Sequence, residues 1–135
     1  MDERLWFMLL VGSYFCHIID DFYLQGILAN LKQREWWEKN APDALYALDY
    51  IVALIVHGLS WATMMLLPFA AWLIASKAYS YTWLFAAAWA INAAVHAFVD
   101  DLKCNKRKIN LIADQCIHFL QILITWFCVL LIVCH

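Results

Sequence analysis

Charged residues are scarce in this chain. Of its 135 residues only 15% are Asp, Glu, Lys or Arg, whereas 66% are hydrophobic and eight are tryptophan. A soluble domain of this length has too much surface for that balance, because about a quarter of the residues of a typical globular domain are charged. The formal net charge of −2 provides no basic field, so nucleic acid is not an expected partner. The scarcity of charge predicts a protein embedded in lipid.

Several familiar motifs are missing as well. The five cysteines are odd in number and show no CxxC spacing, which excludes a simple disulfide framework and predicts free thiols. No HExxH occurs, so the strong zinc-protease signature is absent. The first apolar stretch, from Leu5, follows no basic segment and precedes no small-residue cleavage site. We therefore expect it to be a membrane helix and not a signal peptide.

Long uncharged runs provide the membrane spans. Residues 50–76, 78–99 and 115–135 contain no Asp, Glu, Lys or Arg, and each run exceeds the roughly 20 residues that an α-helix needs to cross a bilayer. The first span is uncharged over 5–19, and we expect its helix to continue through two aspartates to Gln25. The runs are hydrophobic all round, which argues against a soluble bundle. The sequence predicts an all-α fold, a single domain over 1–135 that forms an integral membrane bundle of four transmembrane helices at about 5–25, 46–76, 78–101 and 110–134.

Lysine and arginine predict the orientation. Two connections, 26–45 and 102–110, contain seven of the nine basic residues, and the opposite side has only Arg4 and Lys77. By the positive-inside rule both connections lie in the cytoplasm, which predicts a multi-pass protein of the inner (cytoplasmic) membrane with membrane lipid as its partner. The sequence leaves open whether the protein is a monomer or a homo-oligomer.

Polar side chains recur at helical spacing inside the spans. Residues three or four apart share one face of a helix, so three spans each carry a polar stripe. The stripes lie near the ends of the first and third spans and near the start of the fourth, and His57 lies near the start of the second, which puts all of these residues at one depth in the cytoplasmic half. The ionisable members are His17 and Asp21, His57, His96 and Asp100, and Asp114 and His118; the amides Gln25, Asn92 and Gln121 extend the stripes.

This combination of side chains predicts a metal site. Imidazole and carboxylate ligands suit a divalent transition metal, zinc first, with manganese and iron as alternatives, and helical bundles build such sites from facing helices. We expect His17, Asp21, His57, His96, Asp100, Asp114 and His118 to converge on it. The alternative is that the pairs are hydrogen-bonded and hold the helices together. In a mixed case, aspartates orient histidines and only some of the seven touch the ion.

Neighbouring charged residues receive a different interpretation. Asp20 and Asp101 lie about 100° from their neighbours in the stripes and are expected at helix ends, at the membrane interface. The basic residues of 103–108 are interpreted as a topology signal with lipid contact in preference to a phosphate-binding rim.

The combined pattern resembles a family of small bacterial and phage membrane proteins known only as a domain of unknown function. The resemblance covers nearly the whole chain and is carried by four pieces. These are His17-x-x-x-Asp21-Phe22-x-Leu24-Gln25, then His57, then His96-x-x-x-Asp100, then Asp114-Gln115-x-x-His118. Some members carry a second histidine near the position of His57, where this chain has Ala53 and Leu54. More distantly, the chain is similar to inner-membrane proteins described as metal-dependent hydrolases. The resemblance implies a membrane location and a prokaryotic or phage origin.

Three functional hypotheses follow. The first is a metal-dependent membrane hydrolase whose substrate is a lipid-linked or amphipathic compound bearing phosphate, with Asp21 and Asp114 as candidate catalytic residues. The second is a proton or ion pathway, since intramembrane Asp and His also serve in relays. The third is a non-enzymatic membrane subunit that uses the cluster to hold its helices together. Nothing polar continues through 130–132, which weighs against the pathway.

Overall fold

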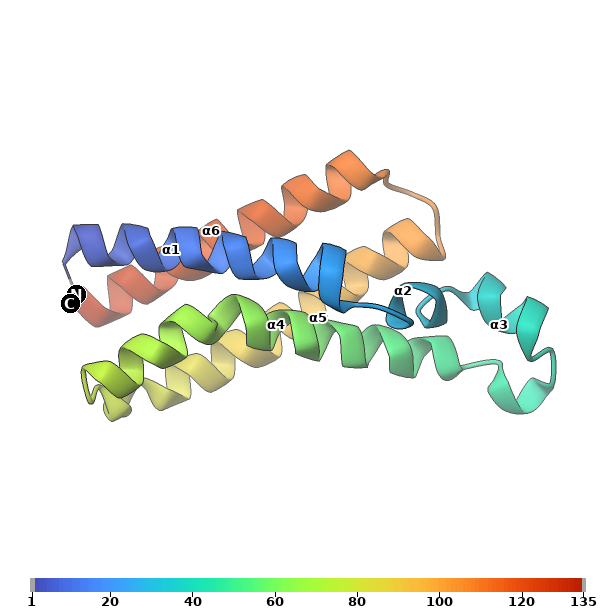
Figure 1. Ribbon diagram of the computed structural model, residues 1–135, viewed down its shortest axis with the longest axis horizontal. Coiled ribbons are helices and arrows are strands. Elements are labelled where there is room, and N and C mark those ends of the chain that lie inside the picture. The colour runs from blue at the N-terminus through green and yellow to red at the C-terminus, as the bar shows by residue number, and fades with distance from the viewer. Residues whose placement is uncertain (1, 135) are drawn as a thin grey trace.

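All regular secondary structure of the chain is helical over the residues that can be described. The computed structural model describes residues 2–134, and no strand occurs in that range. Figure 1 shows how the helices are arranged. In chain order they are α1 (Glu3–Ile19), a π-helical turn η1 (Asp20–Leu24), α2 (Leu28–Leu31), α3 (Arg34–Asn40), a 3-10 turn η2 (Ala44–Tyr46), α4 (Asp49–Ala75), a second 3-10 turn η3 (Tyr79–Tyr81), α5 (Thr82–Cys104) and α6 (Leu111–Cys134). The all-α fold is confirmed.

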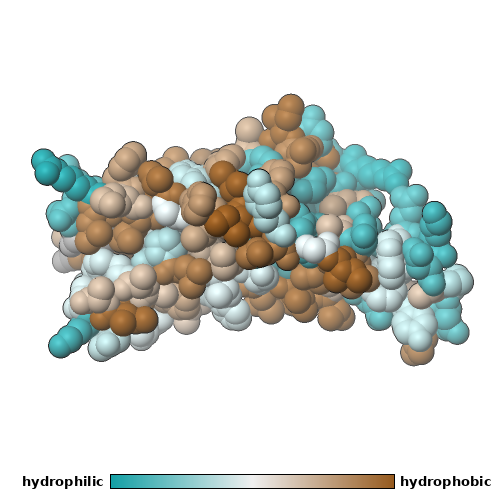
Figure 2. All heavy atoms as spheres, in the orientation of Figure 1, coloured by the Kyte–Doolittle hydropathy of each residue, from teal (hydrophilic) through white to brown (hydrophobic). Residues whose placement is uncertain are grey.

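Within residues 2–134, four helical segments are long and apolar enough to cross a membrane. They are Glu3–Leu24, Ala44–Ala75, Tyr79–Cys104 and Leu111–Cys134, which match the predicted spans to within a few residues. Figure 2 shows a predominantly hydrophobic surface between two more hydrophilic ends. Four apolar helices and a hydrophobic surface of this kind fit a bilayer, so the chain is a multi-pass membrane protein.

The two ends of the bundle carry different parts of the chain. Both termini lie at one end, and α2, α3 and the α5–α6 connection lie at the other (Figure 1). Gly26, with φ +47°, turns the chain out of the first span, a conformation that glycine adopts without strain. The side chain of Asn105 then holds the connector in place, because it donates to the carbonyl of Lys32 and accepts from the amide of Arg34. Lys32 is thereby fixed at the mouth of the bundle.

Helices α4 and α5 approach closely at Gly58. A Cβ atom at this position would lie 2.6 Å from the carbonyl oxygen of Ala93 and 3.2 Å from the Cβ of Ala97. Small residues allow membrane helices to come this near. The close approach brings His57, one residue before the glycine, beside His96 on α5.

The bundle interior toward the termini is apolar and aromatic. Trp61, Met65, Phe69 and Trp126 are fully buried there. The indole N–H of Trp126 donates to the hydroxyl of Ser13, so this buried donor has a hydrogen-bond partner within the aromatic core. This packed half separates the polar stripes from the end of the bundle that holds the termini.

The arrangement predicts which connections share a side of the membrane. Lys77 joins α4 to η3 and Lys106 joins α5 to α6, at opposite ends of the bundle. In a background without native cysteines, Lys77→Cys and Lys106→Cys should react with a membrane-impermeant maleimide from opposite sides of sealed vesicles. Labelling of both from the same side would contradict the four-span topology.

Candidate metal centre

The seven side chains predicted to converge lie in one cluster. Each is at most 4% exposed, and the cluster draws on all four spans. The members are His17 on α1, Asp21 on η1, His57 on α4, His96 and Asp100 on α5, and Asp114 and His118 on α6. Helical spacing within each span and antiparallel packing between spans together produce this convergence.

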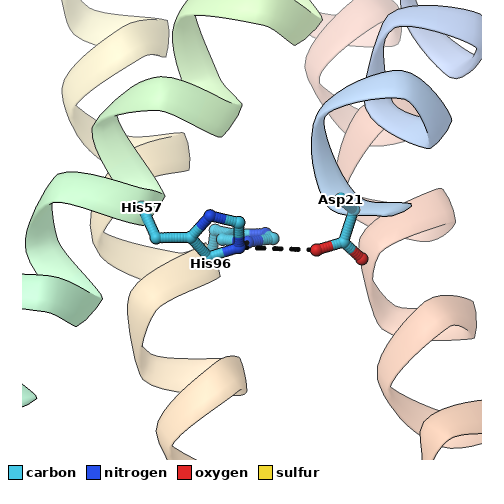
Figure 3. A group of neighbouring side chains, drawn as sticks. All are labelled: Asp21, His57 and His96. Atoms are coloured by element: carbon cyan, nitrogen blue, oxygen red, sulfur yellow. Dashed lines mark hydrogen bonds and ion pairs between the residues drawn. The ribbon is translucent and has the colours of Figure 1, made fainter. Parts of the chain in front are cut away.

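One group of possible ligands joins the first three spans. The ligand atoms of Asp21, His57 and His96 lie within 4.8 Å of one another. Figure 3 shows Asp21 and His57 pointing toward each other from different helices, with the Nε2 and Oδ1 atoms 3.4 Å apart. The Nε2 atoms of His57 and His96 are 3.1 Å apart. Atoms that share an ion about 2.0–2.2 Å away must lie about this close together.

A second group joins the third and fourth spans. His96, Asp100 and His118 also offer ligand atoms within 4.8 Å of one another. The Nε2 atom of His118 lies 3.8 Å from Asp100 and 3.4 Å from Asp114. Because His96 belongs to both groups, it stands at the centre of the cluster.

Hydrogen bonding leaves these atoms unsatisfied. The Nε2 atom of His57 can carry one proton, yet it faces Nε2 of His96 at 3.1 Å and the carboxylates of Asp100 and Asp21 at 3.3 and 3.4 Å. Among the described residues, several buried atoms of the cluster lack any hydrogen-bond partner, including Oδ1 of Asp21, Oδ1 of Asp100, Oδ1 of Asp114 and both ring nitrogens of His118. Buried polar atoms are normally paired. A cation among them would satisfy several at once, so the donor set fits a divalent transition metal.

His17 has a different environment from the other histidines. Its Nδ1 accepts a hydrogen bond of 2.6 Å from the indole of Trp61, and its Nε2 lies 3.2 Å from Oε1 of Gln115. Gln115 in turn donates to Asp21 at 2.7 Å and to Asp114 at 3.1 Å. Both ring nitrogens of His17 are therefore engaged, and the residue orients carboxylates through Gln115.

Trp61 forms the apolar floor of the cluster. Its ring stacks on His96, with centroids 4.3 Å apart and planes inclined by 15°. It also lies 5.5 Å from the ring of His118. The indole fixes two imidazole planes and shields them from the aromatic core beyond.

Two lysines enter the cluster from the side of the connectors. The ammonium of Lys32, 3% exposed, lies 2.5 Å from Oδ2 of Asp100. That of Lys103 lies 2.6 Å from Asp114 and 3.4 Å from Asp100. The sequence predicts lipid contact for Lys103, and the structure corrects this, because the side chain turns inward to two buried carboxylates.

Asp20 also departs from its sequence-based interpretation. It was expected at the membrane interface, but it is 1% exposed, and its Oδ1 accepts a hydrogen bond of 2.8 Å from Ser60 on α4. The first span packs against both α4 and α6, so two adjoining faces are covered and a rotation of about 100° does not reach lipid. The π-helical turn begins at this residue, and such turns are frequent at functional sites.

The charges of the cluster do not balance. Four buried carboxylates, on Asp20, Asp21, Asp100 and Asp114, accompany two ammonium groups, on Lys32 and Lys103. With neutral histidines two negative charges remain, and either one divalent cation or two protonated imidazoles would balance them. Burial of unbalanced charge is costly in a bilayer, so one of these two sources of positive charge accompanies the carboxylates.

The other polar residues that the sequence analysis considered near the stripes lie outside the cluster. Asp101 pairs with Lys106 at 2.7 Å and accepts from Asn105, as expected for a residue at a helix end. The side-chain amide of Gln25 donates to the carbonyl of Asp21. Asn92 and Gln121 form a separate network, one helical turn from the histidines.

Sequence reasoning did not place three contributors to the cluster, namely Lys32, Asp20 and Gln115, in their present roles. Lys32 lies in a connection and not in one of the polar stripes. Only the fold of that connection brings it to Asp100. Gln115 could have been found, since it adjoins Asp114 and lies three residues before His118 in the stripe of the fourth span.

No family model, curated protein or solved structure matches this chain. The chemistry of the cluster is therefore inferred from its own geometry.

Proposed function

We propose that the cluster is a binding site for one divalent transition metal, zinc foremost, and that the protein is a metal-dependent membrane hydrolase. His57 and Asp21, or His118 and Asp100, would hold the ion together with His96. The observation that carries this proposal is the convergence of buried, unpartnered nitrogen and oxygen atoms from all four spans. A divalent metal at such a centre acts as a Lewis acid and makes water nucleophilic near neutral pH.

The other polar groups of the cluster support a phosphate-bearing substrate. Lys32 and Lys103 present ammonium groups beside Asp100, where they would bind phosphate oxygens. Asp114 belongs to neither ligand group, and its Oδ1 has no hydrogen-bond partner among the described residues, so it would accept the proton from water. Asp21 would serve as a ligand oriented by Gln115.

One feature favours hydrolysis over an ion pathway. The fully buried side chains of Trp61, Met65, Phe69 and Trp126 fill the bundle between the cluster and the end that holds the termini. A conduit across the membrane needs polar groups or water through that half. The polar cluster lies instead at the lysine-bearing end, next to Lys32 and Lys103.

The location follows from the same residues. We propose that the connections around 26–45 and 102–110 face the cytoplasm of a prokaryotic cell, with the protein in its inner membrane. Because both connections lie at the lysine-bearing end, a substrate would approach from the cytoplasmic leaflet.

The test is phosphate release from lipids. Purified protein in micelles, loaded with zinc or manganese, should release inorganic phosphate from phosphatidic acid or a polyprenyl diphosphate, and a chelator should stop the release. Asp114→Asn should lower the rate about 100-fold or more while metal content is retained, since loss of a general base costs roughly 10²–10⁴-fold. Asp101→Asn is the matched control and should be unaffected. Metal-loaded protein that is inactive on both lipids would contradict the hydrolase.

A further inference from the structure

A groove runs along the lipid-facing side of the bundle between α5 and α6. It consists of two adjoining hollows, of about 290 and 190 Å³, which share Ile91, Asn92, Ile124 and Thr125. Apolar side chains form most of its walls, and Ile91 and Ile124 are 64% and 53% exposed at its rim. The groove is therefore open to the hydrocarbon of the membrane and not to water.

A hydrogen-bonded network closes the floor of this groove. The side-chain amide of Gln121 donates to both the carbonyl and the Oδ1 of Asn92, at 2.9 and 2.8 Å. Thr125 bonds to Asn92 as well, and Asn92 is only 3% exposed. The network ties α5 to α6 at the bottom of the groove, so the groove keeps its shape without a helix lying in it.

One end of the groove lies at the depth of the candidate metal centre. Val95 and Ile117 line its end, and they adjoin His96 and His118 in the chain. From there it continues along α5 and α6 past Ala88 to Cys128, toward the end that holds the termini. A molecule with its polar group at the cluster would therefore have its apolar part directed toward the middle of the bilayer, which is the orientation of a lipid in the leaflet on the lysine-bearing side.

We infer that the α5–α6 groove binds the hydrocarbon chain of the lipid substrate, with the phosphate group at the cluster. This inference rests on the proposed function and specifies its substrate class as a phospholipid or phosphorylated lipid with a long apolar chain. Burial of each methylene in a shaped apolar site adds dispersion contacts that a mobile bilayer supplies less completely. The groove thus selects for a chain and the cluster selects for a phosphate.

The experiment uses phosphatidic acid with a photoreactive diazirine in one acyl chain, incorporated with the full-length protein in phosphatidylcholine vesicles. After illumination, cross-linked peptides should map to the α5 and α6 segments that line the groove. Ile91→Trp fills the groove with an indole and should lower this cross-linking about tenfold. Ile55→Trp is the matched control, because Ile55 is a similarly exposed isoleucine on α4 outside the groove.

Three results overturn the inference. They are cross-links spread evenly over the lipid-facing residues, an equal loss of cross-linking in both variants, and disulfide-linked dimers of an Ile91→Cys protein that lacks the native cysteines. Metal content and phosphate release are measured on the same samples. Groove cross-linking in a protein that binds no metal would overturn the proposed function alone, whereas metal-dependent phosphate release with unaltered cross-linking in Ile91→Trp would overturn the groove alone.

Discussion

Replacement of Asp100 by asparagine should abolish or severely weaken metal binding, whereas the same change at the next residue should not. Asp100 is fully buried and lies 3.3 Å from His57 and 2.5 Å from Lys32. Loss of a carboxylate that only orients a metal-binding histidine costs about 10–100-fold in affinity, and loss of a ligand costs more. Asp100→Asn also leaves Lys32 without its partner, which should lower the free energy of unfolding by about 3–5 kcal/mol.

Asp101 provides the matched control. It has the same chemistry and nearly the same depth, but it pairs with Lys106, whose side chain is 47% exposed. Exposed pairs of this kind contribute at most about 1 kcal/mol. Metal affinity from competition with a chelator and thermal unfolding should be measured for both variants. Equal losses in Asp100→Asn and Asp101→Asn would mean that the cluster is not the metal site.

The second large effect is expected at His96. Because this residue belongs to both possible ligand groups, His96→Gln should remove stoichiometric metal whichever group binds the ion. His57→Gln and His118→Gln each affect only one group, so the variant with the larger loss identifies the ion's position. The metal content of each variant, measured by plasma mass spectrometry, decides between the two ligand groups. Only protein that elutes from a size-exclusion column as the wild type does is measured.

His17→Gln is the control for this series. Both nitrogens of His17 are engaged by Trp61 and Gln115, so the variant should keep its metal and lose affinity by no more than about 100-fold. Complete loss of metal from His17→Gln, or full retention in His96→Gln, would contradict the assignment of ligands.

The spans and the stripes could be predicted from the sequence because both depend on local patterns. A run such as 50–76 without charge is long enough for a membrane helix, and four-residue spacing puts His96 and Asp100 on one face wherever the helix lies. The common depth followed from antiparallel connectivity. These inferences need no knowledge of which helices touch.

The contributions of Lys32 and Asp20 depend on packing and could not be predicted in that way. Lys32 reaches Asp100 only because Asn105 fixes the connector over the bundle. Asp20 is buried only because the first span packs against two neighbours. Periodicity assigns a residue to a face of a helix, but it does not say how many faces the neighbouring helices cover.

X-ray absorption at the zinc edge of the zinc-loaded protein tests the central claim most directly. A metal held by the His and Asp side chains of the cluster predicts nitrogen and oxygen scatterers at about 2.0–2.2 Å, with the outer-shell features of imidazole. Sulfur scatterers at about 2.3 Å would assign the metal to the cysteines instead. A spectrum of that kind, or a protein that retains no zinc after loading, would contradict the metal centre.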